Sequence, residues 1–354
     1  MYQDNNLLFL FLKCALWNEV DGQFPDSLSK DVSEKLLCTA KDQTVYGLVA
    51  DALIRKEVKL SSKDVFELVS FLANIKRQNQ HLNDELRQFV NLSLEEYFVV
   101  KGQTIAALYP NPMLRTPGDI DFFVHDYKKT SSILQKEWNV VLPNRLIDKE
   151  AQFKHGGVTY EIHISLIEFG SRKHQKYWEQ LMSRQVGYVN VDGVDVPTLE
   201  PTVYAAYVFV HLFFHFIREG VGLRQMCDWA IILHHYYKDI DQQELSTILK
   251  MLGMVKAYRA FGCILVDKLG LVEFPLLIKE KDRIRSKTIL KDIMKGGNFG
   301  KKRKEIHVHG WKSKMRTMRF TFRNCFRYFP VAPTELSLMI PKLTWLNLKL
   351  IFSK

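Results

Sequence analysis

The chain has 354 residues, 47% of them hydrophobic and 25% charged, which is typical of a globular protein with one large or two ordinary domains. Its five cysteines are widely spaced and include no C-x-x-C pair, which excludes a disulfide framework and a cysteine zinc site and favours a reducing compartment, the cytoplasm. The net charge of +11 is uneven, because residues 281–354 contain 19 Lys and Arg but only 4 Asp and Glu.

The apolar stretches do not predict membrane insertion. Residues 7–17 follow Asp4 rather than a basic segment and contain Lys13, which is unlike a signal peptide. Residues 203–217 are too few to span a bilayer and include two histidines, so a buried core helix is expected there.

Residues 1–94 are predicted to form a helical N-terminal region. Apolar residues recur every three or four positions in the stretches 7–17, 45–54 and 65–89. The serines and the aspartate at 61–64 are typical of the start of the third helix.

Residues 95–197 alternate short strands with helices, which predicts a small mixed sheet. The β-branched and aromatic YFVVKG predicts a strand, QTIAALYP predicts one or two helical turns stopped by prolines, and DIDFFV predicts a second strand. The remaining expected elements are a helix at 125–138, a strand at 139–142, a hairpin at 151–166 turning at Gly156-Gly157, a helix near 172–184, and a hairpin turning at Asp192-Gly193.

Residues 198–295 are expected to form a helical lobe, with helices at 203–217, 223–237 and 244–269 and with Thr198 as a capping residue. Residues 296–354 form a basic tail.

Two aspartates stand one residue apart at the start of the second predicted strand. Residues i and i+2 of a strand point to the same face, so Asp119 and Asp121 form a matched pair. Two carboxylates this close raise each other's pKa unless a divalent cation lies between them. The pair therefore predicts a site for Mg²⁺ or Mn²⁺ and, with the metal, phosphate chemistry.

A third carboxylate on a neighbouring strand is usual in two-metal phosphoryl transfer. Glu161 and His163 alternate onto one face of the strand predicted in YEIHIS. The helix between the two acidic strands is long enough for a crossover connection, so Glu161 is expected beside the aspartates.

Phosphate binding also needs donors. Gly102 ends the first strand and begins a short helix, where backbone N–H groups can approach a phosphate, and Lys101 adds a point charge. Thr104 is the nearby hydroxyl, and Arg115 is a second candidate for the triphosphate.

The order strand, glycine, helix, then GDIDFFV and a later strand acid resembles the polymerase-β-like nucleotidyltransferase superfamily. More narrowly, KGQTIAALYPNPMLRTPGDIDFFV, YEIHIS and HFIREGVGLRQMCDWA are similar to a bacterial family of uncharacterised nucleotidyltransferases. The resemblance implies that Asp119 and Asp121 hold metals and nucleotide phosphates and that Glu161 activates the attacking hydroxyl. The sequence departs from the superfamily in having Gly102-Gln103 where Gly-Gly or Gly-Ser is usual, and Glu rather than Asp as the third acid.

Several residues have both a structural and a functional interpretation. His163 is either a hydrogen-bonded structural histidine or part of the site. Arg224 and Asp228, four residues apart, suit a helical ion pair, although the resemblance places this helical region against the nucleotide cleft. His211 and His215 have ligand-compatible spacing, but no third ligand or base follows them at a useful distance, which argues against a zinc hydrolase.

The basic tail contains a predicted amphipathic helix. Apolar residues recur with helical spacing over 311–329, while Arg316, Arg319, Arg323 and Arg327 form an adjacent face. The helix either packs on the protein with a solvated basic face or contacts an anionic membrane, an RNA or an acidic glycan. The apolar run 336–352 favours a membrane or a protein partner, so residues 301–354 are a candidate for peripheral contact with the inner membrane face.

These observations predict an α/β (α+β) protein whose nucleotidyltransferase core has a small mixed sheet between helical N-terminal and C-terminal regions. The four expected parts are 1–94, 95–197, 198–295 and 296–354. The expected reaction transfers a nucleoside monophosphate from an NTP such as ATP to a hydroxyl and releases pyrophosphate, with a sugar, a protein or an RNA end as acceptor. The alternative is a catalytically degenerate module that binds through its basic tail.

Overall fold

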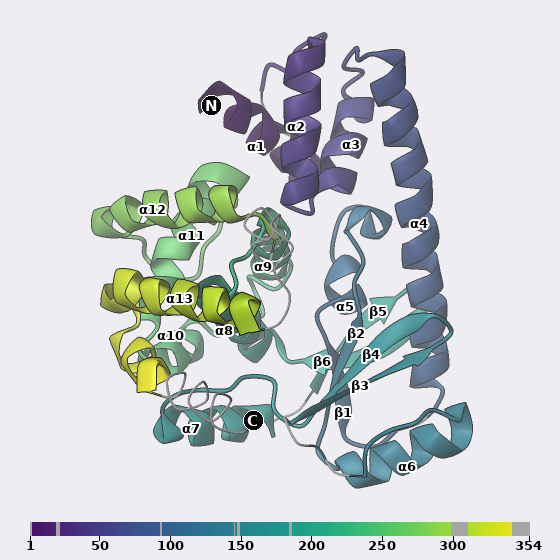
Figure 1. The fold of residues 1–354 in the computed structure, drawn as a ribbon, viewed down its shortest axis with the longest axis vertical. Helices are drawn as coiled ribbons and strands as arrows, with labels where there is room; N and C mark the ends of the chain where they lie inside the picture. The colour runs from purple at the N-terminus through teal and green to yellow at the C-terminus, as the bar shows by residue number, and fades with distance from the viewer. Residues whose placement is uncertain are drawn as a thin grey trace. The chain divides into compact units, whose positions relative to one another are not determined.

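The computed structural model describes residues 2–18, 22–92, 94–144, 146, 149–183, 186–298 and 311–341. It is a helix-rich α+β fold with a small mixed sheet, as the sequence predicts (Figure 1). The chain divides into two compact units, unit 1 with Met1–Leu166 and Gln185–Pro201 and unit 2 with Ile167–Arg184 and Thr202–Lys354. The four-part division expected from the sequence stays a prediction.

Unit 1 contains the N-terminal helices and both sheets. Its elements are α1 (Tyr2–Trp17), α2 (Lys30–Asp42), α3 (Tyr46–Arg55), α4 (Ser62–Val90), β1 (Tyr97–Val100), α5 (Gln103–Ala106), η1 (Pro112–Leu114), β2 (Ile120–Val124), α6 (Tyr127–Trp138), β3 (Glu150–His155), β4 (Val158–His163), β5 (Val186–Val191) and β6 (Val194–Leu199).

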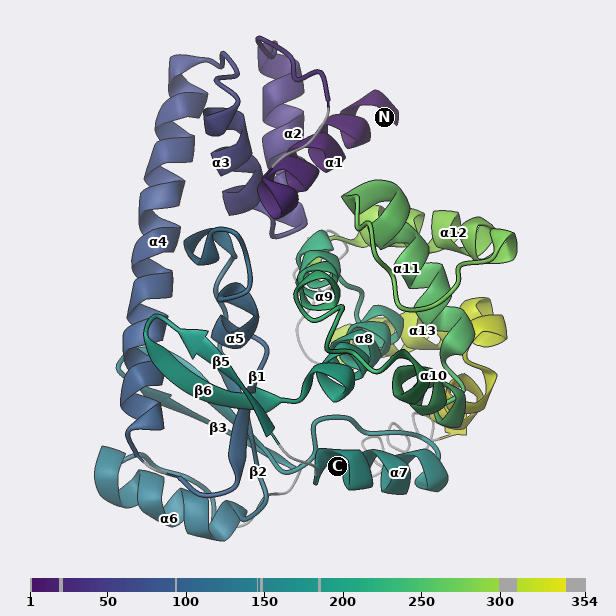
Figure 2. The ribbon, with the colours of Figure 1, turned by 180° about the vertical axis from the view of Figure 1, so that it is seen from behind.

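The first sheet has the strand order β1-β2-β4-β3, in which β2 and β4 are parallel and the other pairs are antiparallel (Figure 1). Figure 2 shows the sheet from behind, beside α4. The register pairs Asp121 with both Val100 and Glu161. Gly156 and Gly157 both have positive φ at the turn between β3 and β4, as the predicted hairpin requires. The sheet therefore brings the end of β1 and the two acidic strands side by side.

Helix α4 covers one face of this sheet. The Ser61 side chain accepts a hydrogen bond from the Asp64 amide and caps the helix where the sequence predicts its start. Further along the helix, the Phe89 ring packs against Phe122 and Tyr160, with centroids 4.5 and 5.7 Å apart. Because residues alternate between faces along a strand, Asp121 and Glu161 are directed to the opposite face.

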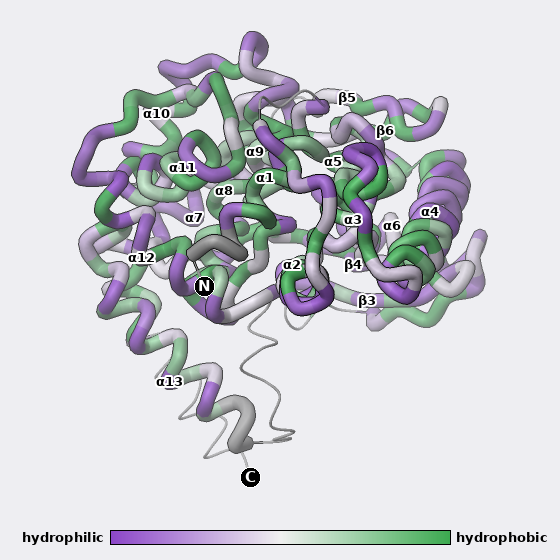
Figure 3. Tube along the Cα trace, turned by 90° about the horizontal axis from the view of Figure 1, so that it is seen from above, coloured by the Kyte–Doolittle hydropathy of each residue, from purple (hydrophilic) through white to green (hydrophobic). Residues whose placement is uncertain are grey.

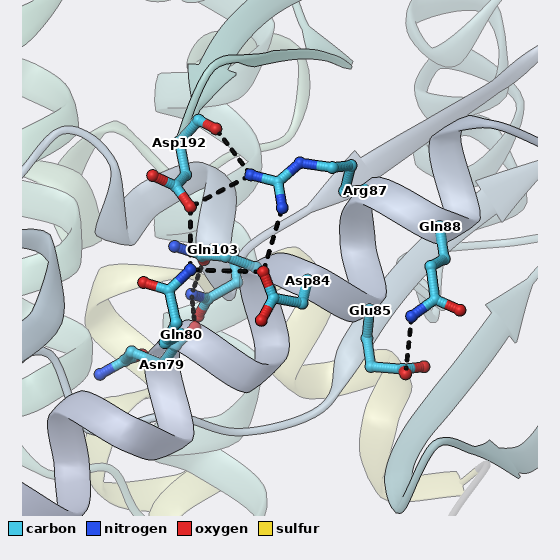
Figure 4. Close-up of polar contacts among 9 residues, drawn as sticks. Asn79, Gln80, Asp84, Glu85, Arg87, Gln88, Gln103 and Asp192 are labelled. Atoms are coloured by element: carbon cyan, nitrogen blue, oxygen red, sulfur yellow. Dashed lines mark hydrogen bonds and ion pairs between the residues drawn. The ribbon is translucent and has the colours of Figure 1, made fainter.

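Helix α4 also holds the hairpin of β5 and β6. Asp192 and Gly193 have positive φ at its two-residue turn. The Asp192 carboxylate accepts hydrogen bonds from Gln80 at 3.1 Å and from Arg87 at 3.2 Å, and both donors lie on α4 (Figure 4). The helix thus ties the second sheet to the first.

Unit 2 is helical. Its elements are α7 (Arg172–Met182), α8 (Pro201–Arg218), α9 (Leu223–His235), α10 (Gln242–Met251), α11 (Val255–Leu269), α12 (Glu280–Gly296), α13 (Trp311–Tyr328) and η3 (Phe329–Val331). Helix α8 lies in its core, where Phe209 contacts the rings of Trp229, Tyr258 and Phe261. The buried helix expected at 203–217 is confirmed, and none of the described helices is long and apolar enough to cross a membrane.

Three local predictions are wrong. Residues 139–142 are not a strand, because Asn139 takes a left-handed conformation that ends α6 and Val141 is 92% exposed. The helix predicted at 244–269 is two helices, α10 and α11, separated at Gly253, where φ is +66°. Thr198 belongs to β6 and donates its hydroxyl to the Val99 carbonyl instead of capping α8.

Candidate metal and nucleotide site

The site begins at the turn that follows β1. Lys101 and Gly102 both have positive φ, a conformation that favours glycine. A Cβ on Gly102 would lie 3.1 Å from the Asp119 carbonyl oxygen, so the missing side chain lets the turn approach the start of β2. Since Val100 pairs with Asp121, the next residue, Lys101, reaches across, and its Nζ lies 3.0 Å from Asp121 Oδ1.

Asp121, Glu161 and His163 form the centre of the site. Each offers one ligand atom, and these atoms lie within 4.8 Å of one another. His163 Nε2 is 3.1 Å from Asp121 Oδ1 and 3.6 Å from Glu161 Oε2. The parallel pairing of β2 with β4 produces this cluster, because it sets Asp121 opposite Glu161. The prediction that the strand of Glu161 lies beside that of the aspartates is confirmed.

Asp121 is buried, and neighbouring cationic groups offset its negative charge. Burial alone would raise the pKa of Asp121, but the Lys101 charge and the hydrogen bond from His163 outweigh it and hold that pKa well below its usual value. Burial alone would likewise lower the pKa of His163, but the hydrogen bonds to Asp121 and Glu161 raise it to about 9. The two cations thus stabilise an ionised Asp121.

Asp119 is in a different electrostatic environment from its neighbour. It lies just before β2 and is only partly buried. Burial, together with the charges of Asp121 and Glu161, raises the pKa of Asp119 to about 6, and Lys101 offsets only part of this effect. An acid with this pKa gains from a nearby divalent cation, because the cation favours its ionised form.

Two residues of β3 contact the cluster. They are not among the site residues predicted from the sequence. Gln152 donates a hydrogen bond of 2.6 Å to Glu161, and Glu150 lies 3.7 Å from His163 Nδ1. Once the turn is fixed at the paired glycines, the hairpin register sets these residues opposite Glu161 and His163. Counting residues back along β3 from this turn would have identified both positions.

The predicted phosphate-binding residues are placed as follows. Gln103 is buried and donates to Asn83 of α4 at 2.5 Å, so its side chain connects the turn to α4 (Figure 4). Thr104 is fully buried and donates to the Lys101 carbonyl at 2.8 Å. Arg115 is 4% exposed and follows η1. Contacts of Lys101, Gly102, Thr104 and Arg115 with a nucleotide stay predictions.

The remaining candidate residues belong to unit 2 and follow this sheet in the sequence. Arg224 and Asp228 are on α9, and their contact with a nucleotide stays a prediction. His211 and His215 on α8 approach each other, with their Nε2 atoms 3.1 Å apart. Among the described residues, they do not belong to a group of three metal-ligating side chains.

The donor set of the central cluster fits a divalent cation. Carboxylate oxygens are the ligands that Mg²⁺ and Mn²⁺ prefer, and an imidazole nitrogen is acceptable to Mn²⁺. Asp121 and Glu161 supply the oxygens, and His163 supplies the nitrogen once it has lost its proton, which its raised pKa of about 9 opposes. The low pKa of Asp121 means that it needs no deprotonation before it binds a cation.

The helix-rich α+β fold with its small mixed sheet is consistent with that of a nucleotidyltransferase-like protein. The chain belongs to the family of uncharacterised nucleotidyltransferases, which matches residues 29–269, more than half of its length. It is also similar, at 16% identity and a TM-score of 0.31, to the crystal structure of an antigenic nucleotidyltransferase-like protein from Paracoccidioides brasiliensis, over 56% of this chain and 92% of that chain. No curated protein matches the sequence.

Proposed function

We propose that this protein transfers a nucleoside monophosphate from an NTP to a hydroxyl acceptor, with release of pyrophosphate, in a reaction that depends on Mg²⁺ or Mn²⁺. The observation that carries the proposal is the gathering of Asp121, Glu161 and His163 within 4.8 Å, beside Asp119 and the turn of Lys101 and Gly102. Membership of the nucleotidyltransferase family supports it.

Each residue has a distinct role in the proposal. Asp119 and Asp121 hold the metal, Glu161 completes the site and accepts the proton of the attacking hydroxyl, and His163 orients the two carboxylates between which it lies. The metal, when bound, offsets the negative charge of the triphosphate and of the leaving pyrophosphate.

Lys101 has two alternative partners in this proposal. In the structure it lies 3.0 Å from Asp121. With Asp121 engaged by a bound cation, Lys101 would be available to contact the triphosphate together with Arg115. Gly102 keeps the backbone open to the phosphates, because a side chain there would come close to the Asp119 carbonyl.

A degenerate binding module is the second candidate, and the same contact favours it. Lys101 and His163 already offset the charge of Asp121, so the folded chain does not need a metal to bury this carboxylate. The two candidates differ in whether the cluster binds a cation and an NTP.

The test uses the purified full chain, NTPs labelled on the α-phosphate, and Mg²⁺ or Mn²⁺. We expect a label on the protein itself or on a component of a cell extract, separated into protein, RNA and glycan fractions, and no label with Asp121→Asn. The matched control is Asp126→Asn, because Asp126 is the capping residue of α6, outside the metal cluster. The absence of metal binding, NTP binding and transfer would support the degenerate module, whereas transfer that Asp121→Asn abolishes would support the enzyme.

A further inference from the structure

Helix α13 has six Lys and Arg residues and no Asp or Glu. At about 100° per residue, its side chains form three stripes. Met315, Met318, Phe322 and Phe326 form an apolar stripe, and the arginines at 316, 319, 323 and 327 form a basic stripe about 100° further around. The third stripe contains Thr321, Asn324, Cys325 and Tyr328.

The third, mostly polar stripe is the one that packs on unit 2. Thr321 and Asn324 are buried, and they donate hydrogen bonds to the last carbonyl groups of α8. The Thr321 hydroxyl is 3.1 Å from the Arg218 carbonyl, and the Asn324 amide is 3.2 Å from that of Ile217. Carbonyls at a helix C-terminus lack partners within the helix, so they favour donors on the packed face of α13.

Two more contacts fix this orientation. The Tyr328 hydroxyl donates to Asp292 of α12 at 2.8 Å, and Arg327 lies 3.3 Å from the same carboxylate. Beyond the helix, the buried Glu335 accepts hydrogen bonds from the amides of Gly170 and Ser171. Contacts at the end of α13 and just beyond it therefore fix the orientation of the helix. Its apolar stripe is directed away from α8.

The predicted apolar stripe is consequently only partly covered, with Met315, Met318 and Phe322 half-buried and Phe326 exposed, whereas a helix that packed by its apolar face would bury it. The Phe326 side chain is 69% exposed, and Phe329, just beyond the helix, is 44% exposed. Arg319 and Arg323 are exposed beside them. Figure 3 shows hydrophilic and hydrophobic residues alternating along α13.

We propose that this face of α13, defined by Phe326, Phe329, Arg319 and Arg323, binds an anionic phospholipid surface. Aromatic side chains next to arginines match an interface in which rings enter the acyl boundary and guanidinium groups pair with lipid phosphates. An RNA would attract the arginines and its bases could stack on the phenylalanines, but it gives no reason for the neighbouring methionines of the apolar stripe. The contact is peripheral, because it uses one face of a helix that is too polar to span a bilayer.

The experiment measures flotation of the full chain with vesicles of phosphatidylcholine alone and of phosphatidylcholine with phosphatidylglycerol. We expect binding to the anionic vesicles only, and weaker binding at high salt. Phe326→Ser with Phe329→Ser, and separately Arg319→Glu with Arg323→Glu, are each expected to reduce partitioning by roughly tenfold or more.

Unit 1 offers matched controls. Phe66→Ser removes an aromatic side chain that is 75% exposed on α4, and Lys76→Glu with Arg77→Glu reverses two charges on the same helix. We expect both controls to bind vesicles like the wild type, and the unchanged unfolding temperature of all variants to show that they fold.

Equal binding to neutral and anionic vesicles would overturn the proposal, as would variants of α13 that behave like the controls. RNA binding could instead decrease when the arginines are replaced and stay unchanged when the phenylalanines are replaced. That result, without any vesicle binding, would assign the surface to nucleic acid. Wild-type binding that tracks the phosphatidylglycerol content and is reduced in both α13 variants supports the proposal.

Discussion

The two aspartates of the site are one residue apart and yet differ in their titration. Lys101 and His163 hold Asp121 in its ionised form, whereas the pKa of Asp119 is raised to about 6 by burial and by the charges of Asp121 and Glu161. In the metal-free protein below about pH 6, Asp121 is therefore ionised whereas Asp119 keeps its proton. The pair is not symmetrical, although its sequence suggests that it is.

A pH dependence follows from Asp119. Its proton leaves as the pH rises through about 6, and His163, with a pKa of about 9, becomes easier to displace from Asp121 in the same direction. We therefore expect Mn²⁺ to raise the unfolding temperature much more at about pH 7 than at about pH 5.

The sign reverses without metal. Because ionised Asp119 is unfavourable in the folded chain, its contribution to the free energy of unfolding decreases as the pH rises from its ordinary pKa of 3.8 through about 6. The difference between the wild type and Asp119→Asn isolates this contribution. A metal effect that is the same at both pH values in the wild type would contradict the assignment of Asp119 as a ligand.

Lys101 gives a second prediction at this scale. Its ammonium group competes with a metal for Asp121, so Lys101→Met is expected to leave Mn²⁺ binding unchanged or several-fold tighter. The same change is expected to raise the KM for the NTP roughly tenfold or more, because one phosphate contact is lost. Titration calorimetry with the metal alone and steady-state kinetics separate the two effects, and a large loss of metal affinity would contradict the competition. Lys128→Met on α6 is the control.

At the scale of elements, local signals predicted most of unit 1. The cap at Ser61, the paired glycines between β3 and β4, and the Asp192-Gly193 turn each have a backbone requirement that a short sequence shows. From these turns the register follows, and with it the position of Glu161 beside Asp121.

The failures have both local and tertiary causes. The apolar residues at 139–142 suggested a strand, but Asn139 adopts a left-handed conformation and no partner strand follows within the described part of this loop. The packed face of α13 could not be found from periodicity, because it is chosen by the carbonyl groups at the end of α8, about a hundred residues away in sequence. The ion pairs of Asp121 likewise depend on how β1 and β4 flank β2.

The turn between β3 and β4 provides a prediction for an element. Gly156 and Gly157 both have positive φ, so alanine is strained at either position. At Gly156 an added Cβ would also overlap the Glu85 carboxylate, which is buried and accepts hydrogen bonds from His155 and Tyr160. At Gly157 the added Cβ would lie 4.0 Å from the His81 ring.

We therefore expect Gly157→Ala to cost about 1 kcal/mol and Gly156→Ala about 2–4 kcal/mol in the free energy of unfolding, measured by denaturant titration. Gly156→Ala is also expected to weaken metal binding, since the hairpin sets the position of Glu161 and His163. Equal losses of unfolding free energy at the two positions would show that the Glu85 carboxylate moves aside without losing its hydrogen-bond partners.

At the scale of the whole molecule, the chain does not complete one unit before it begins the next. It leaves unit 1 after Leu166, returns at Gln185 and leaves again after Pro201. Helix α7 lies in the first excursion, and residues near the C-terminal end of the chain hold its start. The carboxylate of Glu335 accepts from the amides of Gly170 and Ser171 and pairs with His174.

Glu335 is thus expected to anchor two distant stretches of unit 2. Glu335→Ala leaves the buried His174 and the part-buried amides of Gly170 and Ser171 without their acceptor and should reduce stability by about 3 kcal/mol. Hydrogen exchange should report faster exchange at the Gly170 and Ser171 amides. Glu335→Gln keeps an acceptor oxygen and should show a smaller effect, while Ser337→Ala, on the exposed side of the same segment, serves as the control. Unchanged protection of the two amides in Glu335→Ala would contradict the anchoring role.

This threading has a consequence for biosynthesis. Helix α7 leaves the ribosome before β5 and β6, but its partner Glu335 comes 161 residues after His174. At 5–20 residues per second, translation needs roughly 10–30 seconds to cover that distance. Throughout this interval the His174 side chain and the amides of Gly170 and Ser171 lack the carboxylate that binds them in the finished protein, so the start of α7 can take its final position only after the C-terminal part of the chain is made.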